Sequence, residues 1–167
     1  TRSFLAWTTT PWTLPSNLAL AVGPDIDYAL VEMGQDDFVW IAKARMEGYQ
    51  KFLPAEPRIV AEAKGRELAG RAYEPLFPYA VSPKNHVVLE GHFVDTSMGT
   101  GIVHMAPAFG EDDYTLCTAQ GIELFDPVDH QGKFTDAAPD WTGMTVFESN
   151  KHIARNLRER GLLFAQE

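Results

Sequence analysis

A threonine-rich segment near the start of the sequence is the first candidate for chemistry. Its four threonines, which fall within six residues, are Thr8, Thr9, Thr10 and Thr13. Pro11 lacks an N–H and biases the residue before it toward extended backbone, so we expect residues 8–10 to end a β-strand. Such an edge can present hydroxyl and backbone groups to a polar ligand. An ordinary strand end followed by a proline turn is the alternative.

The second candidate segment spans residues 99–114 and combines a Gly-Thr-Gly turn, a histidine on an apolar stretch and an acidic helix start. No helix follows the glycines directly, so they are not a dinucleotide-binding fingerprint. They permit close approach of the backbone to a ligand or to a neighbouring strand. Taken alone, His104 is consistent with a buried core histidine. Asp113 is consistent with an acid that compensates a helix dipole.

Other chemistries find little support in the residues. The histidines at 86, 92, 104 and 130 lack the close spacing of zinc ligands, and the single cysteine, Cys117, cannot supply a thiolate set. Phosphate-binding loops of the Walker type are absent. Cys117 paired with a histidine could act as a nucleophile, but its place within a helix favours burial. We therefore expect no metal and no cofactor in this domain.

Length and charge set further bounds. A chain of 167 residues suits one compact domain over 1–167. Its net charge of −9 argues against a free-standing nucleic-acid-binding protein. Residues 85–150 hold one base against eleven acids, whereas the remainder carries 13 bases and 12 acids. The excess of acidic residues therefore lies in residues 85–150.

Compartment and context can also be predicted. One cysteine excludes an internal disulfide and fits a reducing, cytoplasmic location. Neither a membrane-spanning run nor a signal peptide is visible, so we expect no membrane partner. The N-terminal residues read like a strand entered part-way, which suggests a domain excised from a longer protein.

The elements that must position these residues are mostly strands. Short apolar or alternating runs separated by turn residues indicate strands at 4–8, 18–22, 28–33, 38–42, 58–63, 86–94 and 101–106. Helical spacing and caps indicate helices at 44–53, 111–120 and 150–160. Many short strands favour closure over an open parallel sheet. We predict a mainly β fold with peripheral helices (α+β) and a small closed or partly closed β-barrel core.

Read together, the two candidate segments resemble the editing domain of class I aminoacyl-tRNA synthetases, which is inserted into the catalytic fold of the isoleucyl, valyl and leucyl enzymes. Residues 8–15 resemble its threonine-rich motif, and residues 99–114 resemble its second pocket motif, in the same order about 90 residues apart. Thr10-Pro11-Trp12 replaces the Arg-Pro-Glu or Arg-Pro-Asp expected of the valyl and leucyl forms, so the isoleucyl pattern fits best. The resemblance extends to residues 155–164, although residues 34–85 carry no matching motif.

The resemblance implies a proofreading hydrolase. A hydrophobic pocket rejects a substrate one methylene smaller by only about 1–3 kcal/mol, a limit for which isoleucyl-tRNA synthetases are themselves a known example. A second, size-excluding site is therefore expected to hydrolyse valyl-tRNA(Ile) and valyl-adenylate while excluding isoleucine. The implied partners are the 3′ end of the aminoacylated tRNA(Ile) and the rest of the parent synthetase. ATP and Mg²⁺ would be used by that parent elsewhere.

The resemblance also implies roles for particular residues. Asp113 is expected to bind the α-ammonium group of the substrate. The ester end and the attacking water are assigned to Thr8, Thr9 and Thr10. His104 is expected to lie beside the side-chain pocket and to exclude isoleucine by its bulk. Three further residues are expected to shape the wall or brace the loop: Trp7, Thr13 and Asn17.

Alternatives remain at this level. The signatures His-Ile-Gly-His and Lys-Met-Ser-Lys-Ser are absent, so the chain is not expected to activate amino acids or to charge tRNA. A non-catalytic barrel that binds aminoacyl-adenosine is the second interpretation, and an editing domain of the valyl or leucyl type is another. A structural spacer inserted in a larger enzyme is a further interpretation, although a spacer would not need the threonine cluster.

Overall fold

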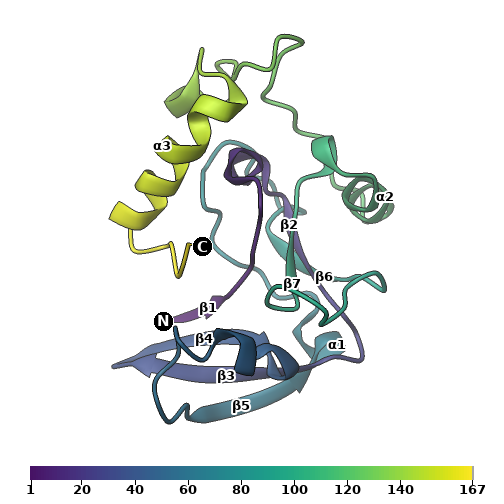
Figure 1. Ribbon diagram of the computed structural model, residues 1–167. Helices are drawn as coiled ribbons and strands as arrows, with labels where there is room; N and C mark the ends of the chain where they lie inside the picture. Colours follow the sequence, from purple (N-terminus) through teal and green to yellow (C-terminus); the bar gives the residue numbers. More distant parts are fainter. Residues whose placement is uncertain (167) are drawn as a thin grey trace. The chain divides into compact units, whose positions relative to one another are not determined.

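The computed structural model describes residues 1–166 and contains two β-sheets with a few helices (Figure 1). One sheet has four strands in the order β1-β4-β3-β5, and the other has three in the order β6-β2-β7. The strands are β1 (Arg2–Phe4), β2 (Ala19–Val22), β3 (Asp27–Gly34), β4 (Asp37–Ala42), β5 (Ile59–Lys64), β6 (Val87–Glu90) and β7 (Ile102–Met105). The α-helices are α1 (Gly65–Leu68), α2 (Glu111–Ala119) and α3 (Val146–Glu159). The 3-10 helices are η1 (Pro11–Ser16), η2 (Lys43–Arg45), η3 (Glu47–Tyr49), η4 (Pro107–Phe109) and η5 (Pro139–Trp141).

Two compact units, each assembled from three stretches of chain, make up this fold. Unit 1 contains Thr1–Trp7, Leu20–Tyr73 and Val87–His104, and unit 2 contains Thr8–Ala19, Glu74–His86 and Met105–Glu167. Neither unit is a continuous segment of sequence. The single domain over residues 1–167 stays a prediction.

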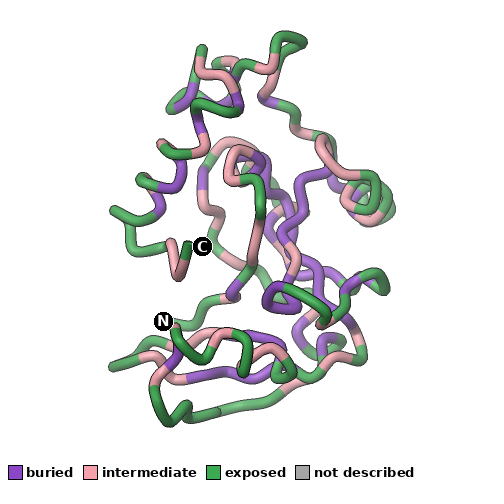
Figure 2. Tube along the Cα trace, in the orientation of Figure 1, coloured by how far each residue is buried: buried purple, intermediate pink, exposed green. Residues whose placement is uncertain are grey.

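Unit 1 is built on the antiparallel pairing of β3 with β4 and β5, and β1 adds a parallel pair to β4. Strand β2 is buried along its whole length, as expected for a central strand of the three-stranded sheet (Figure 2). One hydrophobic cluster of its core is formed by the buried side chains of Leu20, Val22, Tyr28, Leu30, Trp40, Ala42, Leu68, Val88 and Ile102. Tyr28 also carries a hydroxyl into this core, where it accepts from the Gly23 N–H at 2.9 Å and donates to the Gly101 carbonyl at 2.5 Å.

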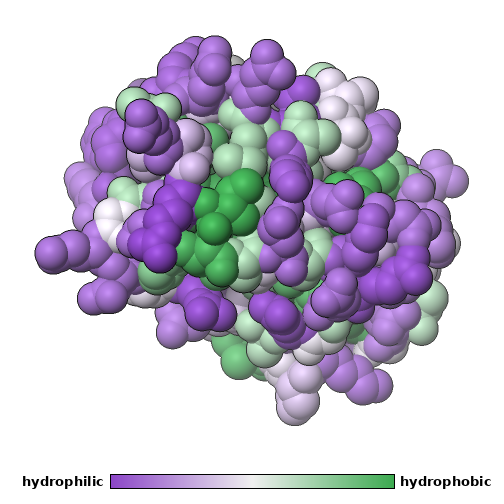
Figure 3. Space-filling model, turned by 90° about the horizontal axis from the view of Figure 1, so that it is seen from below, coloured by the Kyte–Doolittle hydropathy of each residue, from purple (hydrophilic) through white to green (hydrophobic). Residues whose placement is uncertain are grey.

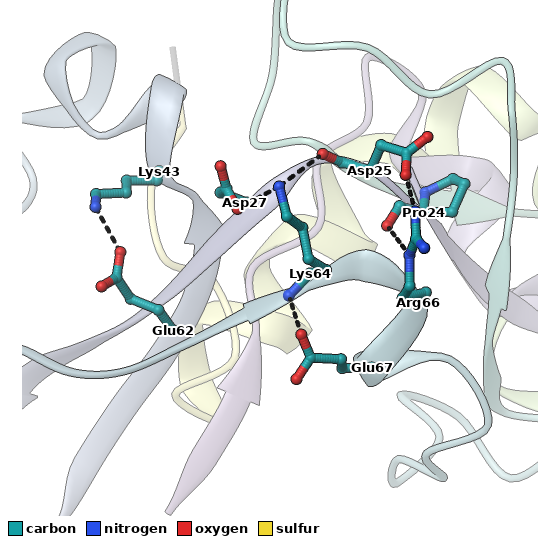
Figure 4. A network of polar contacts seen from close by, with 8 residues as sticks. All are labelled: Pro24, Asp25, Asp27, Lys43, Glu62, Lys64, Arg66 and Glu67. Atoms are coloured by element: carbon teal, nitrogen blue, oxygen red, sulfur yellow. Dashed lines mark hydrogen bonds and ion pairs between the residues drawn. The ribbon is translucent and has the colours of Figure 1, made fainter.

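Strand β5 is an exposed edge strand. Two of its charged side chains pair with neighbouring elements: Glu62 with Lys43 and Lys64 with Asp27 (Figure 4). Arg66 of α1, which follows β5 directly, pairs with Asp25. Charges of this kind discourage edge-to-edge association, although each exposed pair contributes little stability. Large hydrophobic side chains are also exposed in unit 1, and Figure 3 shows hydrophobic residues at the surface within a hydrophilic surround. Nothing in the fold assigns a role to these residues.

Unit 2 carries η1, η4, α2 and α3. A capping box begins α3, because the Thr145 hydroxyl accepts from the Glu148 N–H while the Glu148 carboxylate accepts from the Thr145 N–H, each at 3.2 Å. The core of this unit contains Phe77, Phe134, Ala138, Trp141, Val146, Ile153 and Leu157, with Trp12 and Leu14 of η1 packed against it. Helix α3 therefore supports η1 through the core.

The structure confirms the mainly β fold with peripheral helices and corrects several local predictions. Residues 8–10 do not end a strand; the chain is extended only to a bridge at Trp7, and η1 follows. The helix predicted at 44–53 is wrong, because η2 and η3 are short 3-10 turns there. Helix α3 begins at Val146 rather than at residue 150, since Thr145 caps it. Strand pairing in residues 1–166 gives two separate sheets, so the closed or partly closed barrel stays a prediction.

No helix within residues 1–166 is both long enough and apolar enough to cross a membrane.

Candidate active site

The threonine loop, residues 8–13, is ordered by hydrogen bonds among its own hydroxyl groups. Thr13 Oγ1 donates to the Thr10 carbonyl at 2.9 Å and lies 3.3 Å from Thr10 Oγ1. Thr8 Oγ1 accepts from the Thr10 N–H at 3.0 Å and lies 3.4 Å from Thr10 Oγ1. Each hydroxyl has one proton and that of Thr13 goes to a carbonyl, so donation runs from Thr8 to Thr10 to Thr13. Thr8 keeps an acceptor lone pair at the more exposed end.

Thr9 differs from its neighbours. Its side chain is exposed and makes no hydrogen bond to any other residue in 1–166. Three of the four threonines therefore form one ordered series, and the hydroxyl of Thr9 is left for solvent or a ligand.

Trp12, in η1, attaches this loop to two other elements. Its backbone N–H donates to Asn150 Oδ1 of α3 at 2.9 Å. Its indole lies edge-to-face against Phe109 of η4, with ring centroids 4.8 Å apart and planes at 68°. The sequence analysis assigned no role to Asn150 or Phe109, because neither stands in a pattern that distinguishes it from an ordinary helix or loop residue.

Asp113 lies in the first turn of α2 and is half-buried. Its Oδ2 accepts from the Ala106 N–H at 2.8 Å, and a side chain at Gly110 would come within 2.9 Å of the carboxylate. Burial is the main reason that the pKa of Asp113 is raised, and the Ala106 N–H partly opposes it. No lysine, arginine or histidine within residues 1–166 forms a salt bridge with it. The carboxylate is thus fixed in place, and the part of the chain that the structure describes supplies no compensating cation for it.

Trp7, which directly precedes the threonines in the sequence, contacts the second sequence motif within unit 1. It forms a parallel bridge with Val103 of β7. Gly99, at φ +69°, lies directly against the indole, where a Cβ atom would fall 2.1 Å from ring atoms. The Gly99 carbonyl also accepts from Arg45 Nε at 2.7 Å. Of the two explanations for these glycines, close approach to a neighbouring part of the protein is the one observed.

His104 and Asn17 occupy buried positions. His104 lies on β7, and burial lowers its pKa to about 4, so its ring is neutral at physiological pH. The Asn17 amide donates to the Ala19 carbonyl at 2.9 Å, and its backbone N–H bonds to Leu14 at the end of η1. Asn17 therefore ends η1, and the Nε2 atom of His86 lies 3.1 Å from its carbonyl oxygen.

The structure also bears on two other chemistries, nucleophilic attack by Cys117 and metal binding. Cys117 is buried in α2, and burial raises the pKa of its thiol to about 12, which makes it unsuited to nucleophilic attack. Within residues 1–166, no three His, Cys, Asp or Glu side chains are grouped so as to hold a metal ion. The absence of a cofactor stays a prediction.

Comparison with solved structures defines the class of the fold. The chain superimposes on GlLeuRS-CP1 with a TM-score of 0.75 at 16% identity, covering 95% of this chain and 80% of that one. The P. falciparum cytosolic leucyl-tRNA synthetase editing domain matches with a TM-score of 0.69 at 14% identity, covering 94% and 76%. The fold is therefore that of the editing domains of class I aminoacyl-tRNA synthetases. No family model matches the sequence.

Sequence relatives specify the family. The isoleucine–tRNA ligase of Corynebacterium efficiens is 47% identical over 171 residues, which is 98% of this chain and 16% of that protein. Those of Rickettsia bellii and Mycobacterium tuberculosis are 50% and 49% identical, covering 94% and 92% of this chain. The chain belongs to the isoleucine–tRNA ligase family and spans about a sixth of the length of these relatives. It corresponds to their editing-domain segment.

Proposed function

We propose that this chain hydrolyses valyl-tRNA(Ile), and valyl-adenylate as a second substrate, while sparing isoleucyl-tRNA(Ile). One observation carries the proposal: the half-buried carboxylate of Asp113 is fixed by the Ala106 N–H and has no cationic partner within residues 1–166. A desolvated carboxylate without a counter-ion is costly, and a substrate α-ammonium would offset that cost. The resemblance to editing domains supports the same role.

The threonine loop suits the hydrolytic step. Thr8 has an acceptor lone pair available, so a water molecule that donates to it would be held and oriented, and the exposed hydroxyl of Thr9 can contact the ester end. An aminoacyl ester is already activated, so positioning and electrostatic stabilisation suffice without a nucleophilic side chain. Thr10 and Thr13 hold the loop in its conformation through the hydrogen bonds that their hydroxyl groups make within it.

Specificity is assigned to His104 and Trp7. The neutral, buried imidazole of His104 presents shape rather than charge, which suits a residue that excludes isoleucine by bulk. Trp7 is half-buried, and its indole lies directly against the backbone of Gly99. Such a fixed aromatic side chain suits the wall of a substrate pocket. The proposed partners are the 3′ end of the tRNA and the remainder of the synthetase.

The test uses a full-length isoleucyl-tRNA synthetase that contains this segment and preformed valyl-tRNA(Ile). Asp113→Asn keeps an oxygen that accepts from the Ala106 N–H and removes the charge, so it isolates ammonium binding from structure. We expect hydrolysis to fall about 10- to 100-fold, since a hydrogen bond to a charged group contributes about 1.5–3 kcal/mol. Asp112→Asn, an exposed acid of the same helical turn, is the matched control and should retain activity.

Two outcomes would overturn the proposal. Full hydrolysis by Asp113→Asn would remove the ammonium role. A wild-type enzyme that binds a non-hydrolysable valyl-adenosine analogue without hydrolysing valyl-tRNA would favour the non-catalytic alternative. For specificity, His104→Ala should allow isoleucyl-tRNA(Ile) to be hydrolysed, and resistance of that substrate would assign the exclusion to another residue.

A further inference from the structure

Trp12 connects the threonine loop to the rest of unit 2, although none of the proposed roles uses it. Pro11 has no N–H, and the Thr13 N–H is bonded to the Thr10 carbonyl. The Trp12 N–H has no carbonyl partner in its own 3-10 helix, as is usual for the first turn of a helix. Asn150 supplies the acceptor from α3, 138 residues away in the sequence.

Asn150 is itself held firmly. Helix α3 begins with its capping box, and Ser149 and Ile153, one position before and three positions after Asn150, are buried. The Ser149 hydroxyl donates to the Val146 carbonyl at 2.7 Å, a bond within the first turn of α3. The Asn150 side chain is half-buried, and there its hydrogen bond is less exposed to competition from water.

Phe109 provides the second attachment. It stands in η4, between Ala106, whose N–H fixes Asp113, and Gly110, whose lack of a side chain makes room for that carboxylate. The edge-to-face contact of Trp12 with Phe109 therefore joins the threonine loop to the segment that sets the position of Asp113. Such aromatic pairs add about 0.5–1.5 kcal/mol beyond burial, as a general rule for their geometry.

We propose that Asn150 and Phe109 are positioning residues for hydrolysis, which act through Trp12 to hold the threonine hydroxyls in register with Asp113. The inference rests on the proposed function. Each is assigned an indirect role, because the contact that carries it is with Trp12. A displacement of about 1 Å in a reacting geometry can cost roughly 100-fold in rate, so loss of either attachment acts on the chemical step more than on substrate affinity.

The test compares Asn150→Ala with Asn150→Asp in the full-length synthetase. Alanine removes the acceptor, whereas aspartate keeps an oxygen for the Trp12 N–H. We expect kcat for valyl-tRNA(Ile) hydrolysis to fall about 10- to 100-fold in Asn150→Ala with KM changed less than about threefold. Asn150→Asp should restore kcat to near the wild-type value. Lys151→Ala, an exposed neighbour on α3, is the control and should behave as wild type.

A second measurement does not depend on hydrolysis. Hydrogen exchange of the Trp12 amide should be faster in Asn150→Ala and return to the wild-type rate in Asn150→Asp. If Asn150→Ala does not fold, Phe109→Leu replaces it, since leucine keeps an apolar contact and removes the aromatic edge; its kcat should fall while KM is kept.

The outcomes separate this inference from the proposed function. If the wild-type enzyme does not hydrolyse valyl-tRNA(Ile), the proposed function fails, and amide exchange still reports whether Asn150 holds Trp12. If the wild type hydrolyses it and Asn150→Ala keeps the wild-type kcat, the positioning role is overturned. Equal losses in Asn150→Ala and Asn150→Asp would also overturn it, because the acceptor would then be irrelevant.

Discussion

Gly99 and Trp7 are in direct contact, backbone against indole. A Cβ atom at Gly99 would lie 2.1 Å from two atoms of the Trp7 ring, and the residue adopts φ +69°. Trp7 directly precedes the threonine-rich motif, and Gly99 begins the second motif about 90 positions later. The glycine of the second motif is therefore required by the tryptophan that precedes the threonines.

Gly99→Ala should destabilise the protein by more than backbone strain alone. Gly70 is the matched control, since it also lies in unit 1 with positive φ, at +89°, and has nothing within 4 Å of the position of a Cβ atom. Gly70→Ala should cost about 1 kcal/mol, and Gly99→Ala about 1–3 kcal/mol more. Urea unfolding of both variants measures the difference. Equal losses would show that the indole moves aside without cost.

His104 should make stability depend on pH between about 4 and 6.5, which are its folded and ordinary pKa values. In that range the unfolded chain binds a proton that the folded chain does not, so stability is lost as pH falls and is fully present above 6.5. The loss from this residue is about 3 kcal/mol. Unfolding free energies of wild type and His104→Gln, measured across this range, should converge as pH falls.

His86 acts in the same direction, since burial lowers its pKa too. His104→Gln should therefore keep a smaller dependence on pH, and His86→Gln should remove part of the remainder. An unchanged pH dependence in His104→Gln would contradict the burial of a neutral imidazole.

Asp113 should affect the pH dependence of stability in the opposite direction to His104 and His86. Its pKa is raised by burial, so the folded state binds a proton at higher pH than the unfolded state, and ionisation at pH 7 lowers stability. Asp113→Asn should be at least as stable as wild type at pH 7, and this advantage should shrink as pH falls through the raised pKa. Asp113→Ala, which also leaves the Ala106 N–H without its acceptor, should lose about 1–3 kcal/mol. Urea unfolding at pH 7 and pH 4 checks both.

The thiol of Cys117 should be unreactive toward alkylating reagents in the folded protein. Burial in α2 raises the pKa of its thiol to about 12, so the folded protein should react slowly with iodoacetamide at pH 8 and rapidly once unfolded. Cys117→Ala should hydrolyse valyl-tRNA(Ile) at the wild-type rate. Rapid alkylation of the folded protein, accompanied by loss of hydrolysis, would revive the nucleophilic interpretation of this residue.

Local patterns in the sequence were sufficient for much of the fold. Strands such as β3 and β4 follow from short apolar runs between turn residues, and α2 follows from an acidic first turn and a glycine after its end. The helix predicted at 44–53 failed because Met46, Tyr49 and Phe52 are only half-buried, and of the apolar residues in this segment only Leu53 is buried. Helical spacing without a buried face does not sustain an α-helix. Residues 8–10 do not end a strand as predicted, because the 3-10 helix η1 begins at Pro11.

What the sequence by itself determined is the set of candidate groups: the threonine loop, His104 and Asp113, together with the family they resemble. Only the tertiary structure decided how those groups are held. The Trp12–Asn150 hydrogen bond joins residues 138 positions apart, and the Ala106 N–H that fixes Asp113 belongs to the backbone of a loop. Backbone donors and distant single contacts leave no periodic signal in a sequence, because any residue type at Ala106 other than proline would supply the same N–H.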